Sequence, residues 1–266
     1  MALPLQNVEY IKAISNDTSR SLMGPRQEAW FYRTLKQSSK RGTKWRLIGN
    51  QAVFSQLIVS NDMDLPFNYD AWDGYVANRN RTFATLYENN ITNNIMLAGD
   101  SHASWVSDLV WLDGPTGQEE YDPITGRGSI GVEFAGSAVT SPSPLGQNTT
   151  MKKTEANTKL LTSVNKELQW TDLYYRGYYE LSIGYEGVNA SFFGSPDIRS
   201  RNGFEVSLAN FTVRDGENRL ARYGENNVAS VDGKPVEFGS LQRGKTETRN
   251  QTFDTVEKKW FVFGKK

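Results

Sequence analysis

The chain of 266 residues contains no cysteine and a single histidine, His102. The absence of cysteine excludes disulfide bonds, thiolate-bound zinc and cysteine nucleophiles. Because His102 is the sole imidazole, any metal site must include it or rely on oxygen ligands alone. A serine-hydrolase triad would need the same residue as its base, and no Gly-x-Ser-x-Gly segment accompanies it.

Long apolar runs and an excess of charge are also missing. No stretch approaches the roughly 20 apolar residues that cross a bilayer, so we expect no membrane span. The 30 basic and 30 acidic residues give a formal net charge of zero, which offers no general attraction to nucleic acid. Neither a Walker-type nor a dinucleotide-binding glycine loop occurs, so nucleotide-dependent chemistry is unsupported.

Seven Asn-x-Ser/Thr sequons favour a secreted or extracellular-facing glycoprotein, although an asparagine-rich chain also produces sequons by chance. The first seven residues have neither the charged segment nor the apolar core of a signal peptide. The two observations agree if the chain lacks its natural beginning, so we assign the extracellular location to a full-length parent. The sequons begin at Asn16, Asn80, Asn90, Asn148, Asn189, Asn210 and Asn250.

Apolar residues recur at helical and strand-like spacings through the first half of the chain. After an irregular segment at 1–25, the pattern predicts helices over 26–40 and 75–89. Predicted strands cover 44–57 with an interruption at 49–51, then 94–98, 106–112 and 129–139. This β-α-β-α-β order with short connections is typical of an α/β sandwich.

The second half of the chain is predicted to be richer in strands. Residues 140–157 are rich in Ser, Thr, Pro and Asn and are expected to form a loop. Predicted strands cover 173–185, 190–193, 203–214 and 260–263. We therefore expect an irregular segment at 1–25, an α/β portion at 26–157 and a strand-rich portion at 158–266 that packs on it.

The run Gly99-Asp100-Ser101-His102 follows a short apolar strand. In an extended segment, residues two apart project to the same side, so Asp100 and His102 could address one site. A carboxylate oxygen with an imidazole nitrogen suits iron, zinc or manganese. The alternative is that Asp100 caps a turn and His102 is an ordinary loop histidine.

Two further carboxylates stand in informative places. Asp73 precedes the predicted helix at 75–89 and is expected to be its N-cap, with Trp72 packing back on the core. Glu133 lies inside an apolar strand, where an unpaired buried carboxylate is costly. It can face solvent, bind an arginine or hydroxyl partner, or face the site.

Five motifs in a fixed order resemble the carboxyl-terminal half of the PhoD-like alkaline phosphatases. They are Gln27–Leu35, Lys44–Gln51, Trp72–Arg79, Leu97–His102 and Val132–Pro142. The segments Asp172–Tyr178 and Asn202–Glu205 also resemble the eukaryotic, fungal-type members. The resemblance therefore spans most of the chain.

This resemblance implies a calcineurin-like metallophosphoesterase, with an αββα sandwich and here a strand-rich C-terminal extension. Its implied activity is the metal-dependent hydrolysis of phosphate mono- or diesters, with a small phosphate ester as substrate and iron and calcium, or another divalent metal, as cofactors. Asp100 and His102 match the family's Gly-Asp-x-His metal-binding motif. No residue is assigned a catalytic role beyond these two metal ligands.

The chain departs from the family in what precedes Gln27. The upstream aspartates and the Asp-Asp-His-Glu-type segment of the family have no counterpart, and there is no second histidine. We therefore expect an amino-terminally truncated chain, with half of the sandwich and a sheet edge open to self-association. The alternative is a catalytically inactive fragment that acts as a weak metal-binding or interaction module. A third hypothesis is that the strand-rich tail is a glycan-binding or interaction module.

Overall fold

The structure is a computed structural model that describes residues 5–60, 64, 66–115, 120–201 and 203–222. Beyond these it describes the backbone of five short strands: β9 (Ser230–Val231), β10 (Lys234–Pro235), β11 (Thr248–Arg249), β12 (Gln251–Asp254) and β13 (Lys259–Val262). The sequon at Asn250 lies outside the described residues. Within them, no helix is long and apolar enough to cross a membrane.

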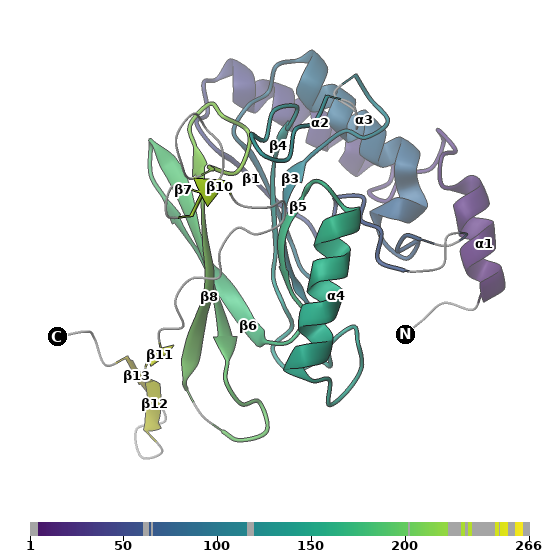
Figure 1. Ribbon diagram of the computed structural model, residues 1–266. Coiled ribbons are helices and arrows are strands. Elements are labelled where there is room, and N and C mark those ends of the chain that lie inside the picture. The colour runs from purple at the N-terminus through teal and green to yellow at the C-terminus, as the bar shows by residue number, and fades with distance from the viewer. Residues whose placement is uncertain are drawn as a thin grey trace.

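A five-stranded sheet forms the centre of the molecule (Figure 1). Its order is β1 (Arg46–Gly49), β2 (Asn94–Ala98), β4 (Gly131–Ala135), β3 (Ser104–Leu109) and β5 (Leu168–Asp172). Strands β1, β2 and β4 are parallel, and β3 is antiparallel to both of its neighbours. The carboxyl ends of β1, β2, β4 and β5 therefore lie at the same edge as the start of β3.

Helices cover one face of this sheet. These helices are α2 (Pro25–Lys40), α3 (Val76–Glu88) and α4 (Met151–Val164), and the 3₁₀ turn η1 (Trp72–Tyr75) leads into α3. Helix α1 (Leu5–Ile14) lies to one side and contacts η1 (Figure 1). Leu35 of α2 and Phe83 of α3 share a buried cluster with Met96 of β2. Leu161 of α4 packs with Trp105 of β3 on the same face.

A second, antiparallel sheet covers the opposite face (Figure 1). It runs β11, β8 (Glu205–Arg214), β7 (Gly187–Ser195) and β6 (Arg176–Ile183). The interface between the sheets is aromatic: the Trp170 ring centroid lies 5.2 Å from that of Phe192 and 5.6 Å from that of Phe211. All three rings are buried, and truncating such a residue to alanine typically costs about 3–5 kcal/mol.

The structure confirms the α/β sandwich and corrects several boundaries. Helices α2 and α3 match the predicted ranges closely, whereas the strand expected over 44–57 ends at Gly49. The amino-terminal segment is not wholly irregular, because α1 lies within it. The loop expected over 140–157 is wrong from Met151 onward, where α4 begins with Thr150 as its N-cap.

A buried polar network ties the far end of β3 to the chain after β8. The Asp108 carboxylate pairs with the Arg222 guanidinium at 2.7 Å, and both side chains are fully buried. The Tyr121 hydroxyl and the Leu220 amide donate to the same carboxylate at 2.9 and 2.8 Å. Removing one member would leave the others buried and unpaired, which is strongly destabilising.

Glu167 lies beside this network, because its backbone carbonyl accepts the Asp108 amide at 3.0 Å. The residue is buried, and this burial raises the pKa of the Glu167 carboxyl from its ordinary value to about 7. In the folded chain the Glu167 carboxyl therefore keeps its proton up to about pH 7, whereas in the unfolded chain it loses the proton at a lower pH.

Replacing Glu167 with glutamine is expected to stabilise the chain more at alkaline than at acidic pH. The wild-type carboxyl binds its proton more tightly when folded, so stability falls as pH rises from the unfolded pKa to about 7. A shift of this size corresponds to at most about 3 kcal/mol. Urea unfolding at about pH 5 and about pH 8 measures the difference between Glu167→Gln and wild type, which should grow with pH. A difference independent of pH would contradict the account.

Candidate active site

The central sheet brings several chain segments together at the edge where its parallel strands end. Asn50 follows β1, the Asp100–His102 turn joins β2 to β3, Gly136 follows β4 and Leu173 follows β5. In open α/β sheets, ligands bind in the crevice outside the carboxyl ends of the strands. We therefore take this edge as the candidate site.

Asp100 and His102 adopt left-handed backbone conformations, with φ of 66° and 57°. The segment is therefore not extended, so the condition under which residues two apart share a side is not met: the chain turns sharply, and the Ser101 amide donates to the Gly99 carbonyl at 2.8 Å. Each non-glycine residue in this conformation costs roughly 1–2 kcal/mol. Such strain is concentrated at ligand-binding and catalytic positions, where the surrounding structure maintains it.

The two side chains on this turn are accessible and uncommitted. Asp100 is exposed and His102 is partly exposed. Neither makes a side-chain hydrogen bond to any residue that the structure describes, so the turn-capping alternative gains no support. A Cβ placed on Gly99 would make an ordinary van der Waals contact with the Gln51 carbonyl oxygen at 4.0 Å.

The donor set fits part of a metal coordination shell. Asp100 offers carboxylate oxygens and His102 an imidazole nitrogen, a pair that suits iron, zinc or manganese. Within the described residues, however, no group of three or more His, Cys, Asp or Glu side chains is placed to hold a metal ion. Asp100 and His102 are thus two candidate ligands, and a complete shell would need donors of another kind or from outside the described residues.

Asp73 has a different role from the one expected. The N-cap of α3 is Tyr75, whereas the Asp73 carboxylate pairs with Arg79 at 2.5 Å in a buried environment. Burial raises the pKa of Asp73, although the Arg79 guanidinium opposes the shift. Trp72 does pack on the core, and its indole N–H donates to the Asn50 side chain at 3.1 Å, which links η1 to the site edge.

Glu133 is buried in the middle strand and binds backbone amides. Its two carboxylate oxygens accept the N–H groups of Phe54 and Ser55 at 2.7 and 2.9 Å. Of the three alternatives left by the sequence, solvent exposure is excluded. Burial raises the pKa of Glu133, and the hydrogen bonds from Ser55 and Phe54 oppose that shift. The residue therefore anchors the segment after β1 to the helical face of the sheet.

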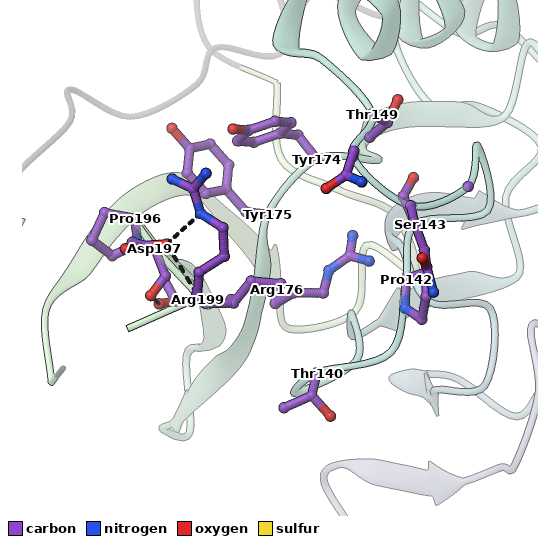
Figure 2. A pocket seen from close by; sticks show the side chains of 15 residues that line it. Thr140, Pro142, Ser143, Thr149, Tyr174, Tyr175, Arg176, Pro196, Asp197 and Arg199 are labelled. Atoms are coloured by element: carbon purple, nitrogen blue, oxygen red, sulfur yellow. Dashed lines mark hydrogen bonds and ion pairs between the residues drawn. The ribbon is translucent and has the colours of Figure 1, made fainter. Parts of the chain in front are cut away.

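A polar cavity of about 460 Å³ lies where the linker between the two sheets meets the loop after β4 (Figure 2). Arg176, the first residue of β6, crosses it, and its guanidinium donates to the carbonyls of Ser141 and Leu173 at 2.9 and 3.3 Å. On another wall, Arg199 pairs with Asp197. Hydrogen bonds from the Arg199 backbone and from Ser200 lower the pKa of Asp197 to about 2.

This cavity was missed by sequence reasoning because its walls come from three separate parts of the chain. The lining residues lie within 140–149, 174–176 and 195–199. The signal that could have marked it is the run Tyr174-Tyr175-Arg176. The Asp172 carboxylate, two residues before this run, accepts the amides of Tyr174 and Tyr175 at 3.0 and 2.7 Å.

The layered α/β fold is similar to that of a solved structure titled "Structure of PhoD". The TM-score is 0.63 at 23% sequence identity, over 83% of this chain and 38% of that chain. A family model described as "PhoD-like phosphatase" matches residues 2–192, and the chain belongs to this family. The expected family resemblance is thereby confirmed.

A curated relative gives the same picture. The chain is 25% identical over 214 residues to "Alkaline phosphatase D" of Bacillus subtilis (strain 168), which is 80% of this chain and 33% of the relative. The chain therefore spans about a third of the length of that relative.

Glycine at position 102 is expected to be more stable than alanine there. Both variants lack the imidazole, but only glycine adopts φ near 57° without a Cβ clash. We expect His102→Gly to have an unfolding free energy about 1 kcal/mol higher than His102→Ala. Urea unfolding of the two variants measures the difference. Equal stability, or a more stable alanine variant, would show that the turn is unstrained.

Proposed function

We propose that the chain takes part in metal-dependent hydrolysis of phosphate mono- or diesters, with Asp100 and His102 as metal ligands. The observation that supports this most is the strained turn at the sheet edge, where Asp100 is exposed and His102 partly exposed. Family membership and the similarity to an alkaline phosphatase support the reaction class. Small phosphate esters are the corresponding substrates.

The ligand chemistry favours a transition metal at His102. Imidazole suits iron and zinc, whereas calcium prefers oxygen ligands such as the Asp100 carboxylate. An iron and calcium pair, or another divalent metal, is consistent with this donor set. A bound cation supplies electrostatic stabilisation of the phosphoryl oxygens.

Neighbouring residues hold the turn in place for this role. The Ser101 hydroxyl accepts the Trp105 indole N–H at 2.7 Å and donates to the Ala103 carbonyl at 3.3 Å. Asn50, bound by Trp72, fixes the adjacent strand end. These contacts let the sheet maintain the left-handed turn that carries Asp100 and His102.

A second candidate function is a weak metal-binding or interaction module without catalysis. It is favoured by the absence of a third His, Cys, Asp or Glu ligand near the pair among the described residues. The two candidates differ in turnover, because only the first predicts hydrolysis.

We also propose an extracellular-facing location for the parent protein. Its support is the exposure of five sequon asparagines on the described surface, where a glycan could attach. They are Asn16, Asn90, Asn148, Asn189 and Asn210.

Hydrolysis of 4-nitrophenyl phosphate and of its bis ester, with added iron and calcium, tests the main proposal. We expect metal-dependent turnover that His102→Ala and Asp100→Asn reduce by at least about a hundredfold, since each removes a ligand. Bound metal, measured by elemental analysis, should fall in parallel. Asp113→Asn serves as a matched control and should keep both properties, because Asp113 is exposed and follows β3 at the opposite edge of the sheet.

Two results would change the conclusion. Metal binding that depends on His102 without any turnover would favour the non-catalytic module. Metal content unaffected by either ligand substitution would remove Asp100 and His102 from the site.

The β1 edge of the central sheet is proposed as a self-association surface. At the other edge β5 is buried throughout, whereas Leu47 on β1 is 40% exposed. The amides of Arg46 and Asn50 donate to carbonyls of the β2 segment. Because successive residues of a strand direct their N–H and C=O groups to opposite sides, those of Leu47 point away from β2, toward the open edge.

Leu47→Lys is expected to shift the chain toward monomer. A lysine on an edge strand opposes strand addition because its charge must be desolvated. Sedimentation velocity across a concentration series measures the change, with Ile183→Lys on the second sheet as control. Wild-type chain that is monomeric throughout would contradict the proposal.

A further inference from the structure

An apolar cavity of about 550 Å³ lies on the helical face of the central sheet. Its walls come from α4, from the segments 53–60 and 66–73, and from the sheet edge near Trp105. Leu57, Leu161 and Leu173 contribute aliphatic surface to it. The volume falls within the range of about 300–1,000 Å³ that is typical of small-molecule sites.

Hydrogen bonds hold the walls of this cavity in position. The Asn165 side chain, at the end of α4, accepts the Ile58 amide at 2.7 Å and donates to the Ile58 carbonyl at 3.0 Å. Glu133 fixes the same segment through the amides of Phe54 and Ser55. The cavity is thus largely formed before any ligand arrives, which lowers the cost of binding.

The cavity has an exposed apolar rim. Val59, Leu160 and Val164 line it, and each is 43% exposed. Asp73, the charged residue among the described lining, is already paired with Arg79. The lining therefore suits an uncharged apolar group and provides no free charge for an ionic one.

Ser101 connects this cavity to the candidate site. Ser101 lines the cavity, and it lies between Asp100 and His102 in the chain. Trp105, which also lines the cavity, binds the Ser101 hydroxyl through its indole N–H. A phosphate group at the turn would therefore have its ester oxygen next to an apolar space.

We propose that this cavity binds the apolar alcohol portion of an amphiphilic phosphate ester, an alkyl or aryl phosphate, whose phosphate lies at the Asp100–His102 turn. The assignment rests on the proposed function and adds a substrate class to it. A small ligand fits better than a second protein copy, because a stable protein interface buries roughly 800 Å² per partner. Three half-exposed rim residues provide far less apolar surface than that.

Calorimetric titration of the metal-free 266-residue chain with butyl, hexyl and octyl phosphate tests this assignment. Each methylene transferred into the cavity should tighten binding about fourfold, so two should give more than tenfold. Leu161→Trp fills the cavity and should abolish this dependence on chain length. Lys159→Trp, on the exposed side of the same helix, adds the same side chain outside the cavity and should retain it.

The outcomes separate this assignment from the proposed function. Because binding is measured without metal or turnover, a chain that fails to hydrolyse phosphate esters can still show the chain-length dependence. Equal affinity for the three phosphates, or equal behaviour of the two tryptophan variants, would overturn the assignment. If Leu161→Trp does not fold, Val164→Lys at the rim replaces it, again with loss of the dependence expected. Dimerisation through the cavity would also overturn the assignment. Sedimentation would then show a dimer whose population does not fall when octyl phosphate is added.

Discussion

The buried carboxylate of Glu133 is the interaction on which the arrangement of the site depends. Its two oxygens hold the amides of Phe54 and Ser55 against the middle strand of the central sheet. From this anchor, the segment after β1 forms one wall of the apolar cavity. Phe54 packs against Trp72 with ring centroids 4.8 Å apart, and Trp72 in turn binds Asn50 at the sheet edge. Loss of the carboxylate would leave two buried amides unpaired, at about 1–3 kcal/mol each.

The strain at Asp100 and His102 has to be supported by the rigidity of the sheet around it. β2 and β3 lie on either side of β4, where each makes a continuous ladder, and the turn between them is short. A flexible connection would relax to ordinary backbone angles. The left-handed turn therefore has an unfavourable backbone conformation that no hydrogen bond from the Asp100 or His102 side chain to a described residue offsets. Such uncompensated strain is common at functional sites.

Sequence periodicity predicted the helices that have a wide apolar face and missed α4, whose apolar residues lie mostly near one end. Helices α2 and α3 carry apolar residues at three- and four-residue spacing, so both were found. Helix α4 was missed because its first nine residues are mostly polar and its apolar contacts come from Leu160, Leu161 and Val164 near its end. Asp100 and His102 were proposed as ligands from their motif, but their left-handed turn was not predicted, since tertiary contacts select that conformation. Asp73 was misassigned because its partner, Arg79, becomes close only once α3 has formed.

The two cavities differ in chemistry because different layers build them. The polar cavity is formed where the linker between the sheets passes Arg176 and the tyrosines, with main-chain carbonyls and hydroxyls on its walls. The apolar cavity is formed under α4, where aliphatic side chains face the sheet. The linker Leu173–Tyr175 contributes to both, since Leu173 lines the apolar cavity and Tyr174 and Tyr175 line the polar one. A linker of three residues therefore separates the two cavities, and its side chains change from aliphatic to aromatic between Leu173 and Tyr174 as it passes from one to the other.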